Sequence, residues 1–130
     1  MSLETSIYSV LTGESSISAL VSTRVYPVTA PDGADFPLII YQKQSHDLGY
    51  SHSSGDDGIY TANYVFYFLG ATYAAASALR DAVRTFLSGY EGTFGGNSVS
   101  LIRLETEDDD FDFETNLYTL RSEYRIDVNS

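Results

Sequence analysis

The chain has 130 residues, of which 43% are hydrophobic and 14% aromatic, and this is the size and apolar content of one domain with one core. Its 7 Lys and Arg against 18 Asp and Glu give a formal net charge of -11, which makes binding to a nucleic-acid backbone unfavourable. The lack of cysteine excludes disulfides, thiolate zinc sites and cysteine nucleophiles. We therefore expect residues 1–130 to form a single domain.

The first half of the chain predicts two short helical pieces and a strand. Apolar residues recur at helical spacing over residues 3 to about 12, and again around residues 16–22. Pro27 then stops any helix. Residues 38–44 are β-branched and aromatic enough to predict a strand. The polar segment that follows, at about 45–58, is rich in Ser, Gly, Asp and His, which indicates a long mobile loop.

The second half predicts three strands and the main helix. Residues 59–69 alternate as a strand does. Thr72 is placed to cap a helix over 73–88, whose apolar residues predict a buried stripe of Ala75, Ala76, Leu79, Ala82, Val83 and Phe86. A strand at 99–105 is followed by an acidic connection and by a last strand at 117–128, with one buried face. Together these elements predict an α+β fold: an antiparallel or mixed four- to five-stranded sheet with two helical segments packed on one face.

One stretch resembles a membrane span. Residues 59–79 contain no charged side chain, which is long enough to cross a bilayer as a helix. Polar residues interrupt the stretch, however, and its apolar period changes from two to about 3.6 part way along. A strand followed by a helix explains it better. Because Glu4 also stands where a secretory signal carries a basic residue, we expect neither export nor contact with a membrane.

An acid cluster occupies residues 105–114. Four of its members alternate, as the first ligands of a calcium loop do: Asp108, Asp110, Asp112 and Glu114. Phe113 stands where such a loop needs glycine, and Thr119 stands where a closing Glu is needed. We therefore expect no metal here, and instead a solvated hairpin tip or an acidic patch that binds a partner.

Catalytic and cofactor-binding patterns are missing from the chain. His46 and His52 lie in the polar loop near acidic residues, but their spacing matches no known ligand pattern. The sequence has no Gly-x-Ser-x-Gly elbow, no His-Glu-x-x-His pair and no phosphate-binding Gly-Lys-Ser/Thr ending. We therefore expect no catalytic residue, no cofactor and no metal, and a protein that is not an enzyme.

Two features suggest contacts with other proteins. The strand at 59–69 has a second face that turns apolar towards its end, and a lone domain would leave that face partly exposed. The main helix carries two arginines one turn apart, for which ordinary surface charge and an inter-subunit salt bridge both remain open. The subunit-interface candidates are Val65, Tyr67, Leu69, Arg80, Arg84, Arg121 and Arg125. Candidates for a partner-binding or channel-lining loop are His46, Asp47, Tyr50, Asp56, Asp57, Asp108, Asp109 and Asp110.

Several segments, taken in order, carry a resemblance. They are Arg24-Val25-Tyr26-Pro27, Ala30-Pro31-Asp32-Gly33 with Pro37, Tyr41-Gln42, Gly70-Ala71-Thr72-Tyr73 with Leu79-Arg80-Asp81-Ala82-Val83-Arg84, and 108–118 before Arg121. In this order and spacing they resemble the tail-terminator, or tail-completion, family of long-tailed phages and prophages. The resemblance covers nearly the whole chain.

The resemblance implies a structural virion protein that joins tail to head. Members of the family form a ring, usually a hexamer, that caps the tail tube, ends its polymerisation and offers a surface to head-completion or neck proteins. We therefore expect a virion location at the tail-neck junction after assembly in the host cytoplasm, with DNA passing through without specific binding. An acidic DNA mimic or other interaction protein, and another neck or connector component, remain as alternatives.

Overall fold

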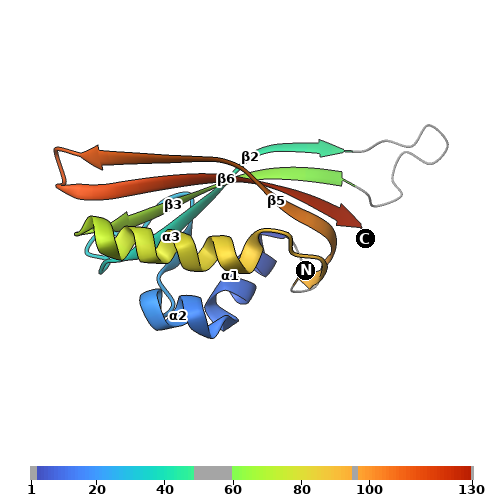
Figure 1. The fold of residues 1–130 in the computed structure, drawn as a ribbon, viewed down its shortest axis with the longest axis horizontal. Coiled ribbons are helices and arrows are strands. Elements are labelled where there is room, and N and C mark those ends of the chain that lie inside the picture. The colour runs from blue at the N-terminus through green and yellow to red at the C-terminus, as the bar shows by residue number, and fades with distance from the viewer. Residues whose placement is uncertain (1–2, 49–59, 95–96, 130) are drawn as a thin grey trace.

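The computed structural model describes residues 3–48, 60–94 and 97–129 (Figure 1). In chain order, the elements within these ranges are α1 (Leu3–Gly13), α2 (Ser15–Val21), β1 (Val25–Pro27), β2 (Leu38–Leu48), β3 (Tyr60–Gly70), α3 (Tyr73–Leu87), β4 (Gly92–Phe94), β5 (Asn97–Asp112) and β6 (Leu117–Asn129). Within the described part of the chain, no helix is both long enough and apolar enough to cross a membrane.

The strands form one mixed sheet in the order β1-β2-β3-β6-β5-β4. The β1–β2 pair is parallel and the other pairs are antiparallel. The helices lie together on one face of this sheet (Figure 1). The predicted α+β class and mixed sheet are therefore confirmed, but the predicted counts were too low, since the described residues contain six strands and three helices. Strands β1 and β4 have three residues each, too few to show an alternating pattern.

The core lies between the inner face of the sheet and the helices. On α3, Ala76, Leu79 and Val83 of the predicted stripe are buried, and Leu87, which was not predicted, is buried with them. The other predicted members, Ala75, Ala82 and Phe86, are half-buried. The inner faces of β3 and β6 supply large aromatic side chains, among them Phe66 and Tyr124 in an edge-to-face contact with ring centroids 5.5 Å apart. Each large side chain buried in this way contributes about 1.5–3 kcal/mol.

A cap and a glycine join β3 tightly to α3. The Thr72 hydroxyl accepts a hydrogen bond from the Ala75 amide at 3.1 Å, as the sequence predicted. Gly70, the last residue of β3, lies so close to this turn that a Cβ atom there would be 3.0 Å from Ala76 N. A side chain at residue 70 would therefore require the first turn of α3 to shift away from the end of the strand.

Residues 45–48 of the predicted loop at 45–58 belong to a strand. Strand β2 continues to Leu48, and a register shift between Lys43 and Ser45 separates this extension from the part of the strand that was predicted. His46 and Asp47 therefore belong to a strand, where they are paired with Ala62 and Thr61 of β3. The other candidates of this segment, Tyr50, His52, Asp56 and Asp57, lie outside the described residues.

The acid cluster lies on a strand and not in a connection. Strand β5 runs for 16 residues to Asp112, so the turn before β6 comprises only residues 113–116. The prediction that β5 ends at Glu105 was wrong. Cations on β6 and on α3 face the acids and offset the repulsion among them, as the ion pairs of the candidate site show. Figure 1 shows the β5–β6 hairpin reaching past the start of α3.

Candidate functional site

Register shifts in β5 determine which acids face α3. One shift lies between Val99 and Leu101 and the other between Leu104 and Thr106. A one-residue shift moves the following side chains to the opposite face of a sheet. Beyond the second shift, Glu107 and Asp109 pair with the buried Ser122 and Leu120 of β6, on the helix side.

The helix-side acids bind two arginines of α3. Arg84 donates from Nε to Glu107 Oε2 at 3.0 Å and from a terminal nitrogen to Oε1 at 3.1 Å. Arg80 donates to Asp109 Oδ1 at 2.7 Å. Four residues of helix rise about 6 Å and two residues of strand rise about 6.7 Å, so the two arginines match the two acids in spacing. Asp81 lies between the arginines, 3.0 Å from Arg84 and 3.5 Å from Arg80.

These pairs stabilise the charged arginines. The hydrogen bonding of Arg84 to the Glu107 carboxylate, in which Arg84 donates, is the main cause that raises the pKa of Arg84. For Arg80, burial acts to lower the pKa, but the Tyr73 hydroxyl and the charges of Asp109, Glu107 and Asp81 together raise the pKa above its ordinary value. Both arginines thus have acidic partners within their own chain. Their predicted role between subunits remains a prediction, because these intrachain contacts do not test it.

The arginines on the outer face of β6 are also paired. Arg121 lies 2.9 Å from Asp108 of β5 and 2.8 Å from Glu123, and Arg125 donates to Asp127 at 3.1 Å. By contrast, Arg103 of β5 is exposed and forms no ion pair with the residues that the structure describes.

The apolar face predicted on β3 is smaller than expected. Val65 lies on the outer face but is only 2% exposed, so the expectation that it stays partly exposed was wrong. Its cross-strand neighbours, Gln42 of β2 and Glu123 of β6, flank it on both sides, and both have longer side chains than valine. Tyr67 and Leu69 are half-buried.

The edges of the sheet are only partly covered. Strand β1 pairs with residues 39–41 of β2, and β4 pairs with residues 97–99 of β5. The turn after α3 adds two backbone hydrogen bonds, which join Gly89 and Tyr90 to Ile102. Within the described ranges, β2 from Gln42 onward and β5 from Arg103 onward therefore have no strand beside them on their outer edges.

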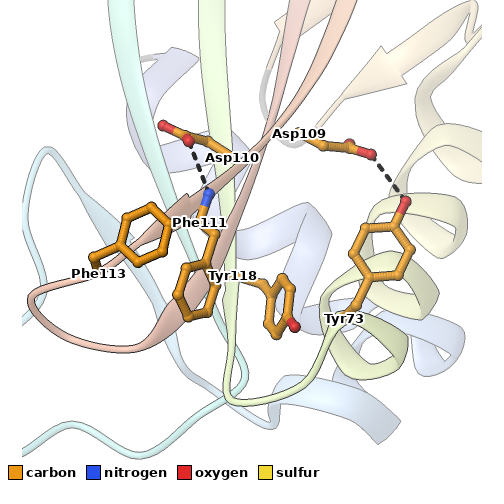
Figure 2. Close-up of a pocket in the computed structure, with 6 residues that line it drawn as sticks. All are labelled: Tyr73, Asp109, Asp110, Phe111, Phe113 and Tyr118. Atoms are coloured by element: carbon orange, nitrogen blue, oxygen red, sulfur yellow. Dashed lines mark hydrogen bonds between the residues drawn. The ribbon is translucent and has the colours of Figure 1, made fainter.

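The end of the hairpin holds an open hollow of about 400 Å³, lined by Tyr73, Asp109, Asp110, Phe111, Phe113 and Tyr118. Figure 2 shows four rings in a row with the two carboxylates to one side. Consecutive ring centroids are 5.1 Å apart for Phe113 and Phe111, 4.8 Å for Phe111 and Tyr118, and 5.8 Å for Tyr118 and Tyr73. Sequence reasoning missed this cluster because it weighed only the acids of residues 108–114, although Phe111 and Phe113 alternate with them.

Part of the negative charge at this end has no cation beside it. Asp110 accepts a hydrogen bond from the Phe111 amide at 2.8 Å, and Asp112 accepts one from the Glu114 amide at 2.9 Å. Across residues 3–48, 60–94 and 97–129, neither acid forms an ion pair. In the same ranges, no three His, Asp or Glu side chains converge as a metal site requires.

Comparisons with known proteins give one family match and one match of fold. The family model described as tail completion protein gp17 matches residues 5–129. A chain of the solved virion of a native gene transfer agent (GTA) particle has the same fold, with a TM-score of 0.77 and 17% sequence identity, over 98% of this chain and 95% of that chain. No curated protein matches the sequence.

Proposed function

The chain belongs to the tail completion protein gp17 family, and from this premise we propose that it forms a ring that caps the phage tail tube, ends its polymerisation and joins tail to head. Family membership makes it a structural protein of a phage tail. The ring, its position at the tail-neck junction and its contacts with tail-tube and neck proteins are the proposed part. The role needs no chemistry from the protein.

The observation that carries the proposal is the pair of open edges on opposite sides of one sheet. The outer edge of β2 beyond residue 41 and that of β5 beyond residue 102 have no strand beside them in the described chain. An unpaired strand edge is a template for another strand. If the β5 edge of one copy joins the β2 edge of the next copy, the contact is head-to-tail. Head-to-tail contacts close into a ring when the rotation between neighbouring copies allows it.

Charge favours this head-to-tail arrangement. The open part of β5 carries most of the acid cluster, so two β5 edges would repel each other. The open part of β2 includes Lys43 and is the better partner for an acidic edge. Half-buried Tyr67 and Leu69 add apolar contact area on the outer face of the sheet, next to the part of β2 that β1 covers and not beside the open edge. Acids left facing a central channel would let DNA pass without binding to it.

Tail-tube growth in the presence of the protein tests the proposal directly. Purified tube protein is polymerised with and without the chain, tube lengths are measured by negative-stain electron microscopy, and the mass of the chain is measured by light scattering with and without tubes. We expect shorter tubes with extra density at one end. We also expect the mass of the chain bound to the tubes to correspond to a ring and not to a monomer. Unchanged tube lengths together with a monomer in both conditions would refute the proposal.

The same purified proteins distinguish the ring from the main alternative, an acidic DNA mimic. An acidic DNA mimic would bind a basic nucleic-acid-binding protein in a salt-sensitive way and would ignore tubes. A pull-down with the tube protein and with a basic DNA-binding protein as competing baits therefore decides between the two roles.

A further inference from the structure

The most exposed large apolar side chain that the structure describes lies at the hairpin end. Phe113 is 85% exposed and Tyr73 is 43% exposed, and both line the hollow between the hairpin and α3. Clustered aromatic rings left in solvent mark a surface that binds something. The hollow takes its walls from α3, β5, the turn after β5, and β6, so only the folded chain assembles it.

The walls of the hollow are held in place before any ligand arrives. Tyr73 donates from its hydroxyl to Asp109 Oδ2 at 2.9 Å, and Arg80 binds the other oxygen of the same carboxylate at 2.7 Å. Tyr118 packs between Tyr73 and Phe111. Ordering this part of the hollow on binding therefore takes little additional entropy.

The lining favours a cation with a flat, weakly hydrated surface. Aromatic faces attract cations, and a carboxylate beside them adds charge attraction. Asp110 supplies that carboxylate, since the cations of the described residues leave it unpaired while the Phe111 amide fixes its orientation. A guanidinium stacks on rings and binds carboxylates better than an ammonium does. Phosphates and other anions are repelled.

We propose that this hollow binds an arginine side chain presented by another protein of the particle. The proposal rests on the proposed function and deepens it by naming the chemistry of the partner. In this assignment the guanidinium stacks against the exposed ring of Phe113 and pairs with Asp110, and the remaining rings form the floor of the hollow.

Charge complementarity favours a different protein over a second copy. The chain has 7 Lys and Arg in total and a net charge of -11. Arg80, Arg84, Arg121 and Arg125 bind acids of their own chain, and Arg24 donates to the carbonyls of Pro37 and Leu20. Of the other two cations, Arg103 is exposed and forms no ion pair with the described residues, so a second copy offers one such arginine against its net charge of -11. A partner with a basic surface offers many cations and is attracted by the acidic chain.

Titration with a minimal ligand tests the chemistry alone. Aromatic NMR resonances are followed as Nα-acetyl-arginine amide is added, with the neutral citrulline analogue as the matched probe. We expect saturable shifts confined to the rings of Tyr73, Phe111, Phe113 and Tyr118, and binding weaker by about fivefold for citrulline. Equal binding of the two probes, or no saturable shift with arginine, would overturn the proposal.

Variants test the partner within the particle. Phe113→Ser and Asp110→Asn are compared with Tyr8→Ser and Asp32→Asn, which change an exposed ring and an exposed acid elsewhere. We expect about tenfold weaker binding to tube or neck protein for the first two variants, with unchanged self-association. If self-association weakens instead, the occupant is a second copy and the proposal is wrong. If even the wild-type chain binds neither tube nor neck protein, the proposed function fails, while the arginine titration still decides the chemistry of the hollow.

Discussion

Arg84 of α3 and Glu107 of β5 form a two-point ion pair, with nitrogen-oxygen distances of 3.0 and 3.1 Å. This pair and the contact of Arg80 with Asp109 fasten the acidic strand to the main helix. The arginines and the acids that the sequence presents as separate features are therefore parts of one contact, and this contact also fixes one wall of the hairpin hollow.

Charge reversal at Arg84 separates its role within the chain from a role between subunits. Arg84→Glu places an acid opposite Glu107, and we expect the free energy of unfolding in urea to fall by about 1–2 kcal/mol, because the partly exposed pair is lost and repulsion replaces it. The double variant that combines Arg84→Glu with Glu107→Arg swaps the two charges, and its free energy of unfolding should return close to that of the wild type.

The swapped variant then reports on ring assembly. If Arg84 also binds an acid of a neighbouring subunit, the swap restores stability but not the ring. A ring that forms normally with Arg84→Glu alone would remove the arginine from the proposed interface.

Tyr124 makes stability fall at alkaline pH. Burial, aided by the charge of Glu107 and opposed by Arg84, raises the pKa of Tyr124 above its ordinary value of 10.0. The folded state therefore keeps this proton where the unfolded state loses it, so the stabilising effect is complete below pH 10 and is lost as the pH rises above it. Tyr124→Phe should reduce the slope of the unfolding free energy against pH by up to about 1.4 kcal/mol per pH unit.

At neutral pH the same variant should be at least as stable as the wild type. The Tyr124 hydroxyl is buried and has no hydrogen-bond partner among the described residues, so removing it leaves no polar group unsatisfied. A loss of more than about 1 kcal/mol in urea unfolding at pH 7 would contradict this account of the hydroxyl.

A side chain at Gly70 should destabilise the fold. In Gly70→Ala the new Cβ atom meets Ala76 N at 3.0 Å and Thr72 O at 3.2 Å. Because both are backbone atoms of the capped first turn of α3, we expect a loss of about 1–3 kcal/mol in thermal or urea unfolding. Gly13→Ala is the matched control, since a Cβ there meets nothing within 4 Å. Equal effects of the two substitutions would show that the close approach is unimportant.

Ring assembly should strengthen as salt is added. Each copy carries a net charge of -11, so association brings like charges together, and salt screens that repulsion. Light scattering at about 0.05 M and about 0.5 M NaCl should therefore show more ring at the higher concentration. More ring at low salt would instead indicate that ion pairs between subunits dominate the interface.

The sequence alone determined the elements whose patterns are long and unbroken. Helix α3 was predicted with its Thr72 cap and its buried stripe, and β3 and β6 were predicted from strict alternation. In each case the side chains repeat with the period of one regular element, so local order is enough to reveal the buried face. The resemblance to tail-completion proteins was likewise visible in short segments and their order.

Only the tertiary structure decided the rest. The course of β5 through the acids was hidden, because its two register shifts move the buried face from one set of alternate residues to the other. The partners of Arg84 and Arg80 lie 23 and 29 residues away, a separation that no local period encodes. The aromatic hollow depends on the course of β5 and on these long-range contacts, since it forms only where the start of α3 meets the end of the hairpin. Contacts between distant segments depend on how the chain folds back on itself, and a linear pattern does not contain that information.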